Sequence, residues 1–335
     1  MKITMNKITR NLKNWLINGR GMKFLLNLIN FPLIGNVYDS IYFKRIEKRV
    51  KNSPISLTIE PNNICNLKCV MCPYKRMKRK KETMPLNLFK KIVDEAKELG
   101  CKDVHMTQYN EPFTDCFLFD RIEYLRKAGM SSWFYSNGML LDSGMRKNVL
   151  ENPPNLIRFS IDGVKKETFE KIRVGADYNK VVNNVFSLYK ERNEKNKKLP
   201  RIEVYFTLFD KNKDEVNDFL KFWKGKCDFA SVYPADSRES EKFVRVNYKK
   251  CRPYPCFNPR RILILSNGLV VLCCVDFEGE VVLGDLTKQT LKQVVNSKKF
   301  KEVFASQMDR SCKIPLCTKC SKLYIDSAFS WWAEK

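Results

Sequence analysis

The segment from residue 55 to about residue 235 alternates between short apolar runs and longer amphipathic runs, and this alternation constrains the fold most strongly. Short runs rich in β-branched and aromatic residues predict strands at 55–60, 104–107, 133–135, 156–161, 202–207 and 229–233. Helical spacing of apolar residues predicts helices at 86–99, 117–127, 143–150, 180–194 and 214–223. Strands that alternate with helices in this way predict a parallel sheet covered by helices.

Six such units are too few for a closed eight-stranded barrel, so the predicted fold is α/β with an open, partial (β/α)6 barrel of the TIM type. After about residue 240 the alternation stops. A hairpin is predicted from 261–265 and 269–275, turning at Asn267-Gly268, with a helix near 291–305. We therefore divide the chain into a basic helical segment (1–50), the partial barrel (51–240) and a small C-terminal α+β subdomain (241–335).

The N-terminal segment leaves two interpretations open. It is a helix packed on the outside of the barrel, or an interfacial helix that makes peripheral contact with anionic lipid. Its apolar stretch at 22–34 is interrupted by Lys23, Asn27 and Asn30, and it is too short and too polar to span a bilayer. No small-residue cleavage site follows it, so we expect no secretory signal and a cytoplasmic location.

The formal net charge is +25, which favours an anionic partner or reflects lysine-rich solvated faces. Positive charge is dense just after the first cysteine group. It suits recognition of a phosphate or carboxylate on a substrate, or it is a solvated loop. The basic residues of this segment are Lys75, Arg76, Lys78, Arg79, Lys80 and Lys81.

The thirteen cysteines fall in tight groups, which in a reducing compartment indicates metal sites rather than disulfides. Cys65, Cys69 and Cys72 form C-x3-C-x2-C directly after the first predicted strand, where chemistry collects in parallel αβ barrels. Three thiolates on a four-iron cubane leave one iron open to a small chelating molecule. A zinc site is the alternative, because the last two cysteines form a C-x2-C pair.

A second group combines C-x11-G-x4-C with a later C-x2-C pair. The predicted hairpin brings the first two cysteines of this group to the same end of the subdomain, and the later pair can approach them there. Four thiolates would then complete a cluster without an open iron. A zinc ribbon is the competing interpretation. The group consists of Cys256, Cys273, Cys317 and Cys320; Cys251, Cys274 and Cys312 lie beside it and leave the ligand choice open. The remaining cysteines, Cys101, Cys116 and Cys227, are expected in the core.

Over residues 55–325 the chain resembles the radical S-adenosylmethionine (SAM) superfamily, whose signature is C-x3-C-x2-C after the first strand of a partial barrel. The resemblance implies that the first three cysteines bind a 4Fe–4S cluster that in turn binds SAM. It places Met71 near the adenine of SAM. The second cysteine group resembles the SPASM and twitch extensions of this superfamily. It implies an auxiliary 4Fe–4S cluster, and a single one, because no cysteine follows Cys320.

The family also implies cofactor-binding residues after the second, third and fourth strands. Tyr109-Asn110-Glu111-Pro112 keeps the Glu-Pro half of a Gly-Gly-Glu-Pro turn, and this implies that Glu111 binds the amino group of SAM. After the third strand, Ser136-Asn137-Gly138 resembles a Thr-Asn-Gly turn near the SAM ribose and carboxylate. After the fourth strand, Ser160-Ile161-Asp162-Gly163 resembles the family's Ser-Ile-Asp-Gly segment, and Arg173 matches an arginine found near the cofactor.

The resemblance implies reductive cleavage of SAM to a 5′-deoxyadenosyl radical that removes hydrogen from a substrate carbon, with electrons from an external donor such as ferredoxin or flavodoxin. One-cluster relatives include an aminocyclitol dehydrogenase. The first expectation is therefore an oxidoreductase or epimerase acting on a carbohydrate-like or other polar small molecule, either neutral or anionic. A peptide- or protein-modifying maturase and a lipid-acting enzyme are the alternatives.

Two other classes stay open at this point. A zinc-stabilised nucleic-acid-binding protein would explain the charge but not Glu111 or the strand-end motifs, so nucleic acid is not the expected partner. A plain electron carrier would not need an open iron. The single histidine, His105, lies in the second predicted strand and gives little support to histidine-based acid–base catalysis.

Overall fold

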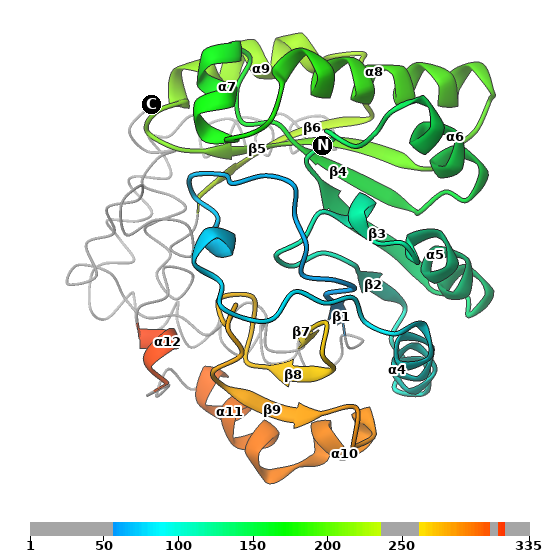
Figure 1. Cartoon of the computed structure of the whole chain (residues 1–335), viewed down its shortest axis with the longest axis vertical. Helices are drawn as coiled ribbons and strands as arrows, with labels where there is room; N and C mark the ends of the chain where they lie inside the picture. The colour runs from blue at the N-terminus through cyan, green and yellow to red at the C-terminus, as the bar shows by residue number, and fades with distance from the viewer. Residues whose placement is uncertain (1–55, 236–260, 309–313, 319–335) are drawn as a thin grey trace, which may run out of the picture.

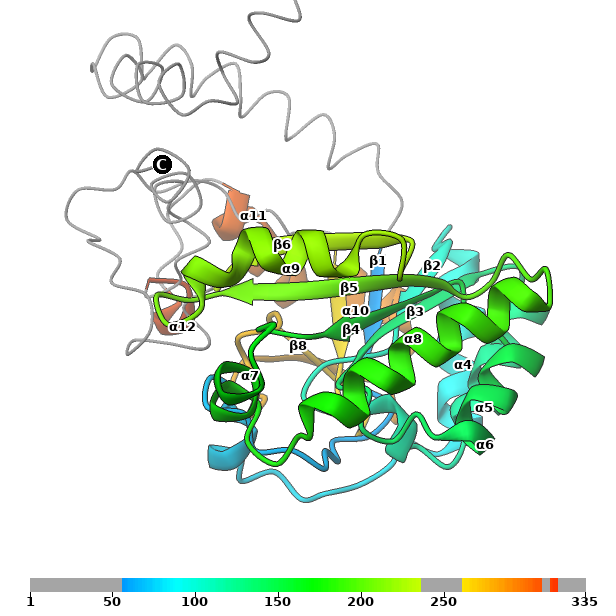
Figure 2. The same ribbon diagram turned by 90° about the horizontal axis from the view of Figure 1, so that it is seen from above.

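The computed structural model describes residues 56–235, 261–308 and 314–318. Its centre is one nine-stranded sheet in the order β6-β5-β4-β3-β2-β1-β7-β8-β9. Neighbouring strands from β1 to β6 are all parallel. The sheet curves into an open arc with α4, α5, α6 and α8 along its outer face (Figures 1 and 2). This arrangement confirms the predicted open, partial barrel.

The barrel elements alternate as the sequence predicts, with bounds that shift by a few residues. All six predicted strands and all five predicted helices are present. One helix was not predicted, α7, because only Phe169 and Ile172 of its seven residues are buried and so short a segment shows no clear period. The elements are β1 (Ser56–Ile59), α4 (Leu86–Glu98), β2 (Asp103–His105), α5 (Leu118–Lys127), β3 (Ser131–Ser136), α6 (Ser143–Glu151), β4 (Leu156–Ser160), α7 (Lys166–Ile172), α8 (Tyr178–Glu194), β5 (Arg201–Leu208), α9 (Val216–Trp223) and β6 (Phe229–Pro234).

Side-chain alternation along the strands separates the helix-covered core from the concave face. In β3, Phe134 is fully buried and belongs to the main core cluster, whereas Trp133 and Tyr135 are half-buried on the opposite face. Helix α4 buries Phe89 and Ile92 on one face, as its spacing predicts. The inward-pointing side chains of the strands are therefore free to line the inside of the arc.

The C-terminal strands extend the barrel's own sheet. The predicted hairpin is confirmed by antiparallel pairing of Leu263 with Val271, and Gly268 at its turn has φ +85°. Strand β7 pairs in parallel with β1, for example Thr58 with Leu263, a long-range pairing that the sequence did not predict. The elements are β7 (Arg261–Ile264), β8 (Leu269–Val271), β9 (Val282–Asp285), α10 (Leu291–Asn296), α11 (Lys298–Met308) and α12 (Pro315–Thr318).

Two predictions about this part and the core were wrong. The single helix expected near 291–305 is two helices, because the backbone at Ser297 is extended (ψ 150°) and ends α10. Cys116 is exposed, whereas Cys101 and Cys227 are buried as predicted. The segment 1–50 and the domain boundary near residue 240 lie outside the described residues. Within the described ranges, the model contains no helix long and apolar enough to cross a membrane.

Candidate active site

The first cysteine group lies in the loop that follows β1, at the carboxyl edge of the parallel strands. Cys69 is buried, and Cys65 and Cys72 are half-buried. Two backbone hydrogen bonds, each 2.9 Å, fix this loop to the end of α7: Lys68 N donates to Val174 O and Val70 N donates to Ile172 O. These bonds hold the three thiols at the strand edge without using any thiol as a structural partner.

The surroundings of these thiols disfavour an uncompensated negative charge. Burial raises the pKa of Cys65 to about 12 and also raises the pKa of Cys69, where the nearby Arg173 guanidinium opposes the rise. A bound cation supplies the missing positive charge and deprotonates such thiols. In the described part of the chain, no group of three or more Cys, His, Asp or Glu side chains is placed to bind one metal ion. The cysteines that bind a four-iron cluster need not be so close together, because each of them binds a different iron.

Glu111 joins the ends of β2 and β3 beneath this loop. Its carboxylate is 1% exposed and accepts hydrogen bonds from Ser136 Oγ (2.8 Å, to Oε1) and from Asn137 N (2.7 Å, to Oε2). Its backbone N donates to Ile64 O at 2.8 Å, which ties it to the cysteine loop. Burial raises the pKa of Glu111 to about 7, and the bonds from Asn137 and Ser136 oppose that rise. Oε1 also accepts from Phe113 N at 3.3 Å, whereas Oε2 keeps a second acceptor site for a ligand.

Asn66 is a site residue that the sequence analysis missed. The Asn137 side chain donates to Asn66 Oδ1 at 2.8 Å, so the strand-end motif after β3 directly contacts the cysteine loop. The available signal was its position, because Asn66 is a polar residue inside the cysteine spacing.

Asp162 and Arg173 form an ion pair beside the same loop. Arg173 Nε lies 2.6 Å from Asp162 Oδ2, and Thr207 N donates to Asp162 Oδ1 at 2.7 Å. Arg173 Nη1 lies 3.9 Å from Cys69 Sγ. Asp162 therefore orients the guanidinium toward the cysteine loop. The other two predicted residues, Ser160 at the end of β4 and Met71, are both buried, and Met71 packs in a cluster with Ile172.

The two residues that replace the expected glycines have structural roles of their own. Asn110 Oδ1 accepts from Gln108 N at 2.9 Å and shapes the turn before Glu111. The Tyr109 hydroxyl donates to Cys274 O at 2.6 Å. The turn after β2 thus contacts the loop of the first cysteine group, through Glu111 N, and the backbone of Cys274 beside the second group.

Only part of the second cysteine group lies among the described residues. Cys273 is half-buried in the turn after β8, where Val275 N donates to its sulfur at 3.4 Å. Cys317 is buried in α12. Cys256 and Cys320, like Cys251 and Cys312, lie outside the described residues, so the four-ligand set stays a prediction.

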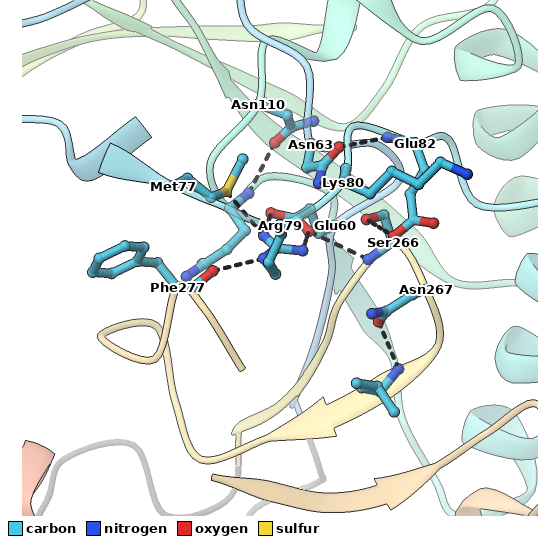
Figure 3. A network of polar contacts seen from close by, with 12 residues as sticks. Glu60, Asn63, Met77, Arg79, Lys80, Glu82, Asn110, Ser266, Asn267 and Phe277 are labelled. Atoms are coloured by element: carbon cyan, nitrogen blue, oxygen red, sulfur yellow. Dashed lines mark hydrogen bonds and ion pairs between the residues drawn. The ribbon is translucent and has the colours of Figure 1, made fainter. Parts of the chain in front are cut away.

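The basic segment after Cys72 is not uniformly solvated. Arg79 forms two 2.8 Å bonds with the carboxylate of Glu60 and donates from Nε to Phe277 O at 2.7 Å (Figure 3). This side chain is therefore committed to a buried ion pair and is not a substrate-recognition group. The other five basic residues of the segment are exposed.

Family comparison decides the class of this site. The model of the Radical SAM superfamily matches residues 59–222, and the SPASM iron–sulfur cluster-binding domain matches residues 256–321. The chain belongs to the radical SAM superfamily. It is an enzyme, and its cofactors are 4Fe–4S clusters and SAM.

Two curated relatives share 30% identity with it. One is a tungsten-containing aldehyde ferredoxin oxidoreductase cofactor-modifying protein of Pyrococcus furiosus, matched over 32% of this chain and 30% of the relative. The other is an uncharacterised protein of Methanocaldococcus jannaschii, matched over 42% of this chain and 46% of the relative. The chain thus spans less than half the length of either curated relative.

Solved structures show the shared fold. BtrN in complex with AdoMet and 2-DOIA has a TM-score of 0.55 at 16% identity, covering 80% of this chain and 93% of BtrN. The structure of anSMEcpe with bound AdoMet has a TM-score of 0.63 at 19% identity, covering 84% and 95%. Streptococcus suis SuiB bound to the precursor peptide SuiA has a TM-score of 0.62 at 13% identity, covering 87% and 74%.

The residues of the radical SAM site fit its cofactors. Three thiols lie on one loop whose burial favours a cationic partner, and the carboxylate of Glu111 is fixed beside that loop. A cavity of about 370 Å³ also borders the loop. Its lining residues are Val70, Thr168, Lys171, Ile172, Phe209 and Lys211.

Below the strand ends, the concave face of the sheet has an aromatic wall of Tyr135, Tyr205 and Tyr233. Tyr205 stacks on Tyr233 with ring centroids 4.9 Å apart, and Tyr135 meets Tyr205 edge to face at 5.2 Å. Arg158 donates to the Tyr135 hydroxyl at 3.0 Å and to Glu203 at 2.6 Å. Tyr233 is 47% exposed, so this wall ends at an accessible aromatic face.

Proposed function

We propose that Cys65, Cys69 and Cys72 hold the SAM-binding 4Fe–4S cluster and that Glu111 receives the amino group of SAM. The decisive observation is the fixed carboxylate of Glu111, which is hydrogen-bonded to β3 and tied through its backbone to the cysteine loop. A buried carboxylate whose Oε2 keeps a spare acceptor site suits an ammonium group. Asn137 and Ser160 face the ribose and carboxylate of SAM, Met71 lies near its adenine, and the Asp162–Arg173 pair borders them.

When bound, the cluster and SAM supply the radical that removes a hydrogen atom from a substrate carbon. The chain's own residues orient the reactants and exclude water. Glu111 fixes one end of SAM, and the apolar cluster around Leu67 and Met71 keeps the loop dry. Cys256, Cys273, Cys317 and Cys320 would hold the auxiliary cluster, which would supply an electron acceptor or a binding group for the substrate. An external carrier such as ferredoxin or flavodoxin supplies electrons, and the net charge of +25 suits an acidic donor.

The substrate class in this proposal is a carbohydrate-like or other polar small molecule, which the enzyme oxidises or epimerises. The aromatic wall supports it, because tyrosine faces with hydroxyl edges bind molecules that have both apolar C–H surfaces and polar groups. The Arg158–Glu203 pair adds a donor and an acceptor on the same face. Lys171 and Lys211 at the cavity favour a substrate with an anionic group.

Deuterium transfer tests this substrate class. Protein reconstituted without oxygen would be incubated with dithionite, SAM and pools of carbon-deuterated cyclitols or sugars. The proposal predicts deuterium in the 5′-deoxyadenosine that forms. Deuterium transfer only from a deuterated peptide would favour the second candidate, peptide modification, which the similarity to SuiB with its precursor peptide supports.

A further inference from the structure

The turn after β8, residues 272–281, which we call the Cys273 turn, is a preorganised unit. The buried carboxylate of Asp276 accepts from Glu280 N at 2.7 Å and from Val281 N at 3.0 Å. Asp276 N donates to Cys273 O at 3.0 Å. These bonds fix the shape of the turn, so the position of Cys273 relative to the barrel depends on the contacts that the turn makes with other segments.

One set of contacts comes from the turn that precedes Glu111. Gln108 Nε2 donates to Cys274 O at 2.9 Å, and the Tyr109 hydroxyl donates to the same oxygen at 2.6 Å. Both lone pairs of this carbonyl are thus used by adjacent residues of one segment. The ring of Tyr109, which is 8% exposed, also meets Phe277 edge to face at 5.8 Å.

A second set comes from the segment after Cys72. Arg79 donates to Phe277 O at 2.7 Å (Figure 3). In the same segment, Lys78 N donates to the Glu278 side chain at 2.8 Å. Both segments that approach the Cys273 turn belong to the proposed SAM site, because one follows the cysteine loop and the other ends at Glu111. Of these contacts, those of Gln108 and Tyr109 are made to the carbonyl of the residue next to Cys273, and the Tyr109 bond is the shorter of the two.

We propose that Tyr109 is a positioning residue for the auxiliary cluster. Its hydroxyl holds the Cys274 carbonyl, and through it the neighbouring Cys273, at a fixed place against the SAM-binding turn. This inference rests on the proposed function, in which Cys273 is a ligand of the auxiliary cluster. Hydrogen bonds and charge around a cluster tune its reduction potential. Loss of the hydroxyl removes one donor from a carbonyl beside the ligand and lowers that potential.

The test isolates the auxiliary cluster in a chain with Cys65→Ala, Cys69→Ala and Cys72→Ala, where the SAM-binding cluster cannot assemble. Tyr109→Phe is added to this chain, and Gln108→Ala is added separately. The control is Tyr124→Phe, because the Tyr124 hydroxyl bonds to Asp94 between α4 and α5, away from both cysteine groups. The EPR spectrum of the reduced cluster and its midpoint potential are then measured in each variant.

We expect Tyr109→Phe to change the EPR spectrum and lower the midpoint potential, Gln108→Ala to shift both in the same direction, and Tyr124→Phe to leave both unchanged. An unaltered spectrum and potential in Tyr109→Phe, with full iron content, would overturn this inference alone. Absence of any iron–sulfur cluster from the triple-alanine chain would overturn the auxiliary cluster and this inference with it.

Discussion

Arg79 and Glu60 form a bidentate ion pair in which both N–O distances are 2.8 Å (Figure 3). The two side chains are 8% and 0% exposed. Glu60 directly follows β1, and Ser266 N in the β7–β8 turn donates to its carboxylate at 3.3 Å. The pair therefore joins the end of the first strand, the segment after the cysteine loop and the β7–β8 turn, and Arg79 adds the Cys273 turn through its bond to Phe277 O.

Removing Arg79 should destabilise the fold, because the buried carboxylate of Glu60 loses its only ion-pair partner among the described residues and keeps just the bond from Ser266 N. We expect Arg79→Ala to lower the free energy of unfolding by about 3–5 kcal/mol. Urea denaturation followed by circular dichroism measures this change. The control is Lys80→Ala in the same segment, whose exposed side chain should contribute less than about 0.5 kcal/mol. Equal stability of the two variants would refute a structural role for the pair.

Glu111→Gln should weaken SAM binding while the iron content stays unchanged. The amide places a donor against either Asn137 N or Ser136 Oγ and removes the charge that an ammonium group needs. Hydrogen bonds to charged groups contribute about 1.5–3 kcal/mol, so the dissociation constant of SAM should rise about tenfold or more. Equilibrium dialysis with labelled SAM measures it. Glu98→Gln, at an exposed position of α4, is the matched control, and a similar small effect in both would contradict the role of Glu111.

Iron and sulfide analysis of anaerobically reconstituted protein should give about eight irons per chain, from two four-iron clusters. Cys69→Ala should retain about four, because one cluster loses a ligand. Cys116→Ser should retain all of them, since Cys116 is exposed and belongs to neither cysteine group. Zinc without sulfide in the unmodified protein would instead support a zinc-stabilised protein.

The close packing of β9 on α10 at Gly284 predicts that a substitution there changes the stability of the fold. A Cβ at Gly284 would clash with the Val294 side chain, which is fully buried. We expect Gly284→Ala to destabilise the fold by about 1–3 kcal/mol in thermal or urea denaturation. Gly144→Ala is the control, because its Cβ would meet only Asp142 at 3.5 Å and alanine is the better helix former in α6. A stable Gly284→Ala variant would show that α10 adjusts to the extra methyl group.

Local pattern was sufficient to predict the barrel and the positions of its polar strand ends. Glu111, Ser136 and Asn137 follow successive strands, and parallel strands bring their carboxyl ends to one edge, so their meeting follows from topology. The same argument does not apply to Asn66, because a loop has no period that predicts which of its side chains will contact a strand end.

Contacts between residues that are far apart in the chain could not be predicted from the sequence. Arg79 lies in a run of basic residues, and nothing in that run distinguishes it from its exposed neighbours. Its partners lie 19 and 198 residues away, at Glu60 and Phe277. The parallel pairing of β7 with β1 was missed for the same reason, since a short apolar strand does not specify its neighbour.

The most direct test of the central claim is the yield of 5′-deoxyadenosine when the anaerobically reconstituted protein is incubated with dithionite and SAM. The account predicts that the unmodified chain forms this product and that Cys65→Ala does not, because its cluster lacks a ligand. No 5′-deoxyadenosine from unmodified protein that contains its four-iron clusters, or equal amounts from Cys65→Ala, would contradict it.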